Sequence, residues 1–332
     1  MQNKSTESIR NRVHDWNNRS RPVGKRLVHD AAISSHLTIP SYAKINLGLR
    51  IVGKRSDGCH DLETIFQQIS LRDTIAIELA SPSKELGIRL SSNIPGLPVD
   101  SSNLAVRAAE LFCEKAGCAL SIKIDLQKTI PIGAGLGGGS SNAATVLLGL
   151  NRLLGCPLAE AELHSCAVRL GADVPFFLRG GVAVATGIGD VLKSLAYTPN
   201  YHIVIVAPGI AISTKWAYTN LKIRLTNTKN NLKLSHFLLQ QSDLSDWPES
   251  LLNDFEPLVF GKYKEIQAIR DKLYLVGANY ASLSGSGSAV YGIFDREEKA
   301  REGVDCFRPH YSTFLTKPMQ FGLNEVLTYR EG

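Results

Sequence analysis

Hydrophobic and polar residues alternate over residues 42–52, and this period of two predicts a β-strand. Every second residue from position 43 to position 51 is apolar, whereas Lys44, Asn46 and Arg50 lie between them. Lys44 and Asn46 therefore share a face, about 7 Å apart at ~3.3 Å per residue. The polar face of such a strand is usually solvated, so the pattern alone allows either an exposed face or paired functional side chains.

The rest of the chain contains both strand-like segments, with a period of two, and segments with the apolar spacing of helices. Strands are predicted at residues 64–71, 74–79, 120–126, 181–186 and 201–207, and after a small-residue loop within residues 280–294. Helices are predicted at residues 103–115, 158–170, 263–275 and 297–304, with Ser101 and Ser102 as candidate caps of the first. Residues 222–250 are polar and predict a loop with a short helix near residues 235–241. The length of 332 residues suggests about two domains.

A glycine-rich arc at residues 130–151 is the strongest local signal. Five of the seven residues from 133 to 139 are glycine, and helical spacing of apolar residues follows from position 143. Ser140, Ser141 and Asn142 are of N-cap type at this junction. Free amides and the positive end of a helix dipole would meet there, which predicts an anion site, most simply for phosphate. The alternative is a glycine turn that only allows close helix packing.

Two familiar phosphate loops do not fit the arc. It lacks the Gly-Lys-Ser/Thr ending of a Walker-type loop, and no strand–helix–strand unit of a Rossmann site opens the chain. Phosphoryl transfer needs positioning, a cation near the moving phosphate and a base for the attacking hydroxyl. Lys44 and Asp173 could supply the last two, although Asp173 would by default be an N-cap for the Pro175 turn. A second small-residue loop at residues 284–288 could close over the phosphates.

Composition narrows the function classes. Hydrophobic content of 44% and charged content of 20% are typical of a globular protein. The net charge of +6 is concentrated in residues 1–36, which hold seven Lys/Arg against three Asp/Glu, so we expect no nucleic-acid binding by the body. That segment is expected to be a disordered extension, a targeting peptide or a mis-assigned start. No apolar run approaches the ~20 residues of a membrane span. Six cysteines without a CxxC pair favour no metal site and a reducing cytoplasm.

Several of these segments together resemble the GHMP kinase family. The resemblance rests on Tyr-Ala-Lys-Ile-Asn-Leu at residues 42–47, the loop at 131–144 and Ser-Gly-Ser-Gly at 284–287, and covers roughly residues 39–300. Asp57-Gly58-x-His60 and Gly-Ala-Asp-Val-Pro-Phe-Phe at 171–177 resemble the branch whose substrate carries a cytidine diphosphate group.

The resemblance implies an α+β fold of two domains. Residues 37–196 would form an ATP-binding domain like ribosomal protein S5 domain 2, and residues 197–332 a ferredoxin-like domain. The enzyme would use ATP, with Mg²⁺ held mainly by the phosphates and no metal site of its own, to phosphorylate the 2-hydroxyl of a cytidine-diphosphate methylerythritol. That reaction belongs to the non-mevalonate route to isoprenoid precursors. We further expect a monomer or weak homodimer in the cytoplasm, with no nucleic-acid or membrane partner.

The resemblance also implies roles for individual residues. Lys44 and Asp173 would be catalytic, with Asp173 taking the hydroxyl proton. Substrate contacts would come from Asn46, His60, Tyr218, Gly285, Ser286 and Gly287. ATP would be bound by Pro131, Gly133, Ala134, Gly135, Leu136, Gly137, Gly138, Gly139, Ser140 and Ser141, with Asn103 and Lys128 near the adenine. One position departs from the family, because Cys59 stands where a tyrosine usually stacks on the cytosine.

Two other functions remain open at this point. One is a related kinase for another small alcohol. Cytidine nucleotides would not protect such a kinase, whereas ATP would. The other is a non-catalytic nucleotide-binding regulator that uses the basic residues 1–36 on nucleic acid. A non-catalytic relative should lack an acidic base, whereas Asp173 is present.

Overall fold

The computed structural model describes residues 36–79, 86–221, 234 and 243–320. They form two β-sheets with helices, an α+β arrangement as predicted. In this described part, no helix has both the length and the apolar composition to cross a membrane.

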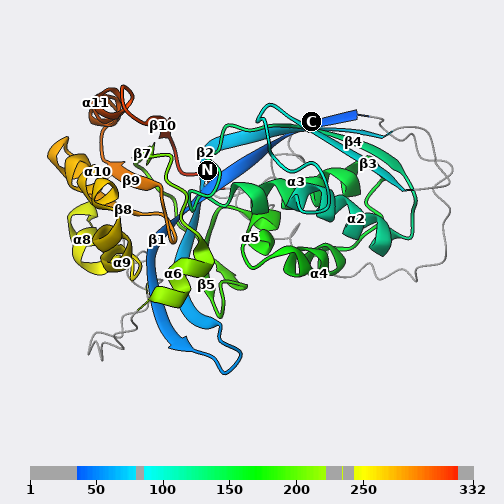
Figure 1. Cartoon of the computed structure of the whole chain (residues 1–332), viewed down its shortest axis with the longest axis horizontal. Coiled ribbons are helices and arrows are strands. Elements are labelled where there is room, and N and C mark those ends of the chain that lie inside the picture. Colours follow the sequence, from blue (N-terminus) through cyan, green and yellow to red (C-terminus); the bar gives the residue numbers. More distant parts are fainter. Residues whose placement is uncertain (1–35, 80–85, 222–233, 235–242, 321–332) are drawn as a thin grey trace, which may run out of the picture. The chain divides into compact units, whose positions relative to one another are not determined.

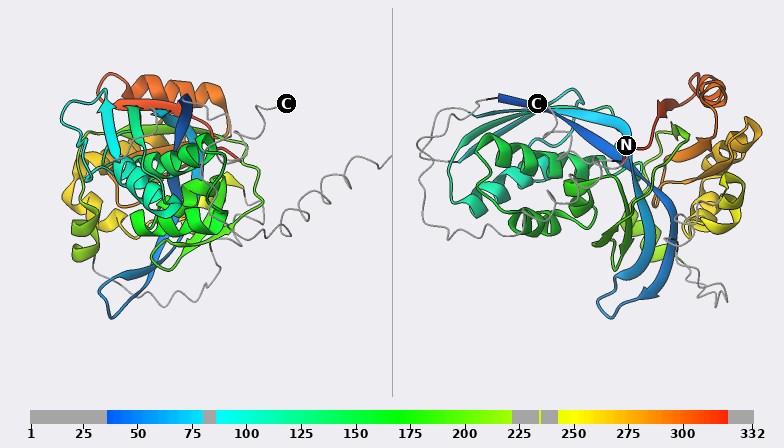
Figure 2. Two further views of the ribbon diagram at one scale, coloured as in Figure 1. Left: turned by 90° about the vertical axis from the view of Figure 1, so that its right-hand side faces the viewer. Right: turned by 180° about the vertical axis from the view of Figure 1, so that it is seen from behind.

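The first sheet has six strands, with β3, β4, β2, β5 and β6 in that order and β1 paired with β2. Their bounds are β1 (His36–Lys54), β2 (His60–Leu79), β3 (Gly87–Ser92), β4 (Ser121–Gln127), β5 (Val182–Thr186) and β6 (Val191–Ser194). Front and back views show helices on one face of this sheet (Figures 1 and 2). These are α2 (Leu104–Ala116), α3 (Gly138–Leu153), α4 (Glu160–Leu170) and α5 (Val174–Arg179).

The second sheet is antiparallel, with strand order β10, β7, β9 and β8. Numbered along the chain this is the order 4-1-3-2 of a ferredoxin-like plait, which agrees with the predicted fold. The strands are β7 (His202–Ala207), β8 (Tyr280–Leu283), β9 (Val290–Phe294) and β10 (Ser312–Thr316). The helices in this part are α6 (Thr214–Asn220), η2 (Leu244–Asp246), α8 (Trp247–Ser250), α9 (Glu256–Lys262), α10 (Lys264–Leu275) and α11 (Glu297–Phe307).

The long β1–β2 hairpin connects the two sheets. The Tyr291 hydroxyl on β9 donates to the carbonyl of Asn46 at 2.7 Å, and the backbone of β1 bonds to Leu252 through the Leu49 amide. Both faces of β1 are buried here, and Lys44 and Asn46 are only 4% and 2% exposed. The solvated polar face considered from the sequence is therefore wrong: Lys44 bonds to Asn46 in the interior, and the second sheet packs on the opposite, apolar face of β1.

The structure corrects several predicted elements. Residues 64–71 and 74–79 belong to one strand, β2, and the charged interruption at Asp73 lies in the protein interior. Helix α3 begins at Gly138, after Gly137 in a left-handed conformation (φ 70°) without a side-chain cap. Ser140, Ser141 and Asn142 are thus the third to fifth residues of the helix and not caps. Asn103 caps α2 through the Ala105 amide, and Ser101 and Ser102 do not.

Some short elements of the structure had not been predicted, and some predicted segments lie outside the described residues. The short strands β3, β6, β8 and β10 and the short helices α5, α6, α8 and α9 had not been predicted. The short helix expected near residues 235–241 lies outside the described residues, as does the extension at residues 1–36 apart from its last residue, His36. The domain limits at residues 37–196 and 197–332 stay a prediction.

Candidate active site

A cavity of about 450 Å³ opens between the glycine arc, the β1–β2 hairpin and the second small-residue loop. Its volume lies in the usual range for small-molecule sites. Most of the site residues predicted from the sequence line it: Lys44, Asn46, Asn103, Lys128, Pro131, Gly133, Ala134, Gly135, Leu136, Gly137, Gly138, Gly139, Ser140, Asp173, Tyr218, Gly285 and Ser286.

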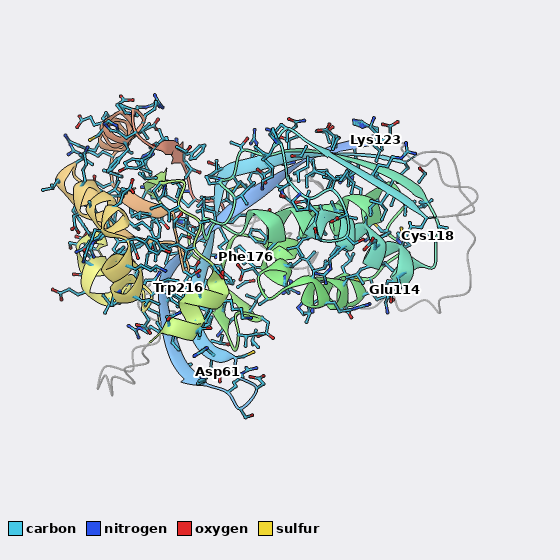
Figure 3. The ribbon with its side chains drawn as sticks, viewed as in Figure 1. Asp61, Glu114, Cys118, Lys123, Phe176 and Trp216 are labelled. Atoms are coloured by element: carbon cyan, nitrogen blue, oxygen red, sulfur yellow. The ribbon has the colours of Figure 1, made fainter. Side chains whose placement is uncertain are left out.

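Three predicted residues lie outside this wall. The Ser141 hydroxyl is buried and pairs with Ser41 at 2.8 Å. An added Cβ at Gly287 would face Leu283 and Ile212, away from the cavity. His60 is buried against Tyr218, whose ring does line the cavity. Figure 3 labels Phe176 on α5, Trp216 on α6 and Asp61 on the hairpin, three elements that carry or adjoin site residues.

The glycine arc uses conformations that only glycine adopts readily. Gly133, Gly135 and Gly137 have φ values of 66°, 80° and 70°. At Gly137 a Cβ would stand 2.7 Å from the Phe177 ring and 3.1 Å from Cγ of Lys44. The arc therefore needs glycine for backbone shape and for close approach, and it leads into the N-terminus of the 16-residue helix α3. This combination is an anion-binding geometry.

The second loop, residues 284–288, is fastened to the arc. The Ser284 hydroxyl donates to the carbonyl of Gly135 at 2.9 Å, and the Ala289 amide donates to the carbonyl of Ala134 at 3.0 Å. A Cβ on Gly135 would lie 2.0 Å from the Ser284 carbonyl oxygen. The loops thus touch through their backbones, which fixes the width of the cavity at this point.

Lys44 and Asp173 meet at the cavity floor. The Lys44 ammonium lies 3.5 Å from Oδ2 of Asp173 and donates to Oδ1 of Asn46 at 2.6 Å. The Lys44 side chain is 5% exposed and that of Asp173 is 35% exposed, so the carboxylate remains open to the cavity. Asp173 occupies the N-cap position of α5 without a capping hydrogen bond. The default capping role considered from the sequence is therefore wrong.

A second carboxylate, the fully buried Asp73, holds the two ends of the arc together. Its Oδ1 accepts from the amides of Thr129 and Ile130 at 2.7 and 2.8 Å, at the entry to the arc. Its Oδ2 accepts from the Lys128 ammonium at 2.5 Å and from the side-chain amide of Asn142, the fifth residue of α3, at 2.9 Å. Lys128 therefore reaches the cavity wall as half of a buried ion pair.

We expect Asp73→Asn to destabilise the fold strongly. The substitution leaves the Lys128 ammonium, only 6% exposed, facing a neutral amide. Removing one partner of a buried pair costs about 3–5 kcal/mol, which urea denaturation will measure as a fall in the free energy of unfolding. The control is Glu78→Gln, which removes an exposed pair with Lys123 on the same sheet and should cost no more than about 1 kcal/mol. Equal losses for the two variants would contradict the anchoring role.

The far end of the cavity is aromatic. The His60 and Tyr218 rings stack with centroids 5.3 Å apart, and Tyr218 meets the Phe255 ring edge-on at 4.9 Å. Burial, and then the charge of Lys54, lowers the pKa of His60 below its ordinary value of 6.5, which favours the neutral ring. Burial, and then the charge of Asp173, raises the pKa of Tyr218 to about 12, so its phenol keeps its proton. This end offers flat faces and neutral polar groups.

Sequence reasoning missed three residues that shape the site. Asp73 interrupts an apolar strand, and that charged position in a buried run was the available signal. Thr64 lines the cavity and bonds to Asn46, but its alternating strand pattern gave no indication of this. Asn253 donates to the carbonyls of Leu283 and Gly285 at 2.8 and 2.9 Å, and so supports the second loop.

Two family models match the chain, and each match contains residues of the cavity wall. Residues 103–181 match the GHMP kinases N terminal domain, and residues 237–312 match the GHMP kinases C terminal domain. The first match contains the arc and Asp173, and the second contains the loop at residues 284–288.

Similar proteins extend the match over most of the chain. A 4-diphosphocytidyl-2-C-methyl-D-erythritol kinase of Chlorobium phaeobacteroides strain BS1 is 45% identical over 285 residues, 85% of this chain and 98% of that protein. The protein of the same name from strain DSM 266 is 47% identical over 289 residues, 85% of this chain and 95% of its own length. A crystal structure of 4-(cytidine 5'-diphospho)-2C-methyl-D-erythritol kinase is 32% identical, with a TM-score of 0.72, covering 85% of this chain and 99% of that one.

Proposed function

Because the chain belongs to the GHMP kinases, in the branch of 4-diphosphocytidyl-2-C-methyl-D-erythritol kinases, we infer that it phosphorylates this cytidine-bearing alcohol with ATP. The reaction is a step of isoprenoid precursor synthesis. We propose the 2-hydroxyl as the acceptor. The observation that carries the assignment of roles is the Lys44–Asp173 pair, 3.5 Å apart, on the floor of a cavity walled by a phosphate-type glycine arc.

The proposed reaction transfers the γ-phosphoryl group in one step. Asp173 accepts the proton of the acceptor hydroxyl while the oxygen forms a bond to the γ-phosphorus. The bond from that phosphorus to the β-phosphate oxygen breaks, and ADP leaves. Such reactions depend on positioning and on charge stabilisation more than on covalent chemistry by the protein. Asp173 suits the task because its carboxylate is open to the cavity and makes no capping bond.

Lys44 would supply the positive charge beside the moving phosphoryl group. Its stem is buried between the arc and the Phe66 ring, and its ammonium lies 5.0 Å from that ring's centre. The backbone amide of Lys44 donates to the carbonyl of Leu136 at 3.0 Å, so the residue is tied directly to the arc. A cation held this firmly stabilises developing charge without reorganising during the reaction.

The aromatic end would hold the cytosine. Tyr218 offers a ring face, and neutral His60 can both donate and accept a hydrogen bond. Cys59, where the family usually has tyrosine, is exposed and offers no second ring face. A missing stacking face is worth about 1–3 kcal/mol per base, so we propose weaker base binding here with the same chemistry.

The donor set fits an Mg²⁺ ion held mainly by the nucleotide phosphates. Mg²⁺ usually takes one or two protein oxygens and keeps several waters. The Ser140 hydroxyl and the Asp173 carboxylate are such oxygens in the cavity wall. The described residues contain no group of three His, Cys, Asp or Glu arranged to hold a metal unaided. When bound, the ion would neutralise phosphate charge.

The oligomeric state and the location of the protein stay predictions: a monomer or weak homodimer in the cytoplasm.

A coupled assay of ADP release tests the proposal. With the cytidine-diphosphate methylerythritol as acceptor, we expect turnover in the usual enzyme range of about 1–10³ s⁻¹. Homoserine and mevalonate serve as control acceptors, because a homoserine kinase and a mevalonate kinase have the same fold, and they should give only the background rate. Cytidine nucleotides should inhibit competitively with the alcohol.

Other outcomes would select the alternatives. Turnover with another small alcohol and no competition by cytidine nucleotides would identify a different kinase of the family. ATP binding without turnover of any acceptor would favour a non-catalytic nucleotide-binding regulator. If the protein is such a regulator, deletion of residues 1–36 should change its binding to nucleic acid. If it is the proposed enzyme, the same deletion should leave turnover unchanged.

A further inference from the structure

A directed line of hydrogen bonds runs from the catalytic pair into the β1–β2 hairpin. The Lys44 ammonium donates to Oδ1 of Asn46 at 2.6 Å, and Nδ2 of Asn46 donates to the Thr64 hydroxyl at 2.9 Å. The Thr64 hydroxyl then donates to the carbonyl of Gly48 at 2.5 Å. The three residues of this line, Lys44, Asn46 and Thr64, are at most 4% exposed.

The chemistry of the groups allows only one direction for this line. A carbonyl oxygen can only accept, so the single hydroxyl proton of Thr64 is committed to Gly48. The Thr64 oxygen must then accept from Asn46, which places Nδ2 toward Thr64 and Oδ1 toward Lys44. An ammonium can only donate, so the opposite orientation of the amide would leave Lys44 facing two N–H donors.

The hairpin supplies the end of the line through a β-bulge. The pairing of β1 with β2 shifts register between Leu47 and Leu49, and Gly48 lies there with φ 68°. A bulge residue lies outside the regular ladder and bends the strand, and such bulges often adjoin active sites. Here the bulge turns the Gly48 carbonyl toward Thr64, which pairs with Leu49 across the strands.

We propose that Thr64 is a positioning residue for the kinase reaction. By fixing the Asn46 amide, it fixes the direction of the Lys44 ammonium toward Asp173 and the transferring phosphoryl group. The inference rests on the proposed roles of Lys44 and Asp173. Thr64 has no reacting group of its own to offer, because its proton is held by Gly48 and its oxygen already accepts from Asn46.

The test compares Thr64→Val with Thr64→Ser. Valine keeps the size and branching of threonine and loses the hydroxyl, so Asn46 becomes free to reverse its amide. We expect kcat to fall about ten- to a hundredfold, the range for leaving a buried polar group without its partner. The KM for ATP should stay within about twofold, since the arc is untouched. Serine keeps the hydroxyl and should restore kcat to within about threefold of wild type.

A matched control separates positioning from general stability. Thr316 is a buried threonine on β10 whose hydroxyl accepts from the Leu71 amide at 2.9 Å, away from the cavity lining. Thr316→Val makes the same chemical change and should lower the melting temperature without changing kcat. If the two variants melt at the same temperature and lose kcat to the same extent, the loss in Thr64→Val reflects general stability, and the positioning role is overturned.

A crystal structure of Thr64→Val gives a readout that needs no substrate. We expect the Lys44–Asn46 bond to be lost and the ammonium to leave its place beside Asp173. Unchanged distances of 2.6 and 3.5 Å would overturn the inference even if the acceptor alcohol proved to be different. A raised KM for the alcohol with unchanged kcat would also overturn it, because Thr64 would then be a substrate contact. Inactive wild-type protein in the ADP assay would count against the proposed function instead.

Discussion

Asp173→Asn should lower kcat about 10²–10⁴-fold, the usual contribution of a general base. The amide has nearly the shape of the carboxylate and cannot accept the hydroxyl proton. Binding should change little, because Asp173 makes no capping bond in α5 and its side chain is 35% exposed. Steady-state kinetics in the ADP-release assay, with KM measured for both substrates, will test this.

The control for that experiment is Asp305→Asn on α11. Asp305 also pairs with a cation, Arg308 at 3.4 Å, but on an exposed surface away from the cavity lining. Its loss should leave kcat unchanged and cost no more than about 1 kcal/mol of stability. If Asp173→Asn kept more than a tenth of wild-type turnover while folding normally, Asp173 would not be the base, and the hydroxyl proton would have to leave by another route.

The sequence was sufficient wherever one short segment carried the whole signal. The glycine arc was predicted to be an anion site because the glycines and the following helical spacing lie together in residues 130–151, and the structure gives it the left-handed glycines and the following helix that this prediction requires. Period two correctly placed Lys44 and Asn46 on one face of β1. The fold class followed from the family resemblance, which the family matches and the 4-1-3-2 strand order support.

The sequence was insufficient where a residue's role depends on distant partners. Asp73 interrupts β2 and was interpreted as a break between strands, because its four hydrogen-bond donors lie 55 to 69 positions away. The N-cap types Ser140, Ser141 and Asn142 suggested a later start for α3, whereas Gly137 provides the turn with its backbone alone. The burial of β1 on both faces required the second sheet, whose position no local period encodes.

The contact between the two loops gives the second large prediction, for Gly135→Ala. A methyl group there would lie 2.0 Å from the Ser284 carbonyl oxygen and 3.2 Å from the Gly287 carbonyl oxygen. Both neighbours are backbone atoms, so the second loop must move away from the arc. Misplacement of about 1 Å at a site of this kind can cost 10²-fold. We therefore expect kcat/KM for ATP to fall about 10²-fold.

Backbone strain alone could weaken Gly135→Ala, and Gly209→Ala measures that part separately. Gly209 has φ 74°, close to the 80° of Gly135, and an added Cβ would meet no atom within 4 Å. Its substitution introduces left-handed strain of about 1–2 kcal/mol without a collision and should leave kcat/KM unchanged. Thermal melting compares the stability of the two variants, and ATP titration compares their binding. If both variants lose the same stability and both bind ATP normally, the backbone contact between the arc and the second loop does not set the width of the nucleotide site.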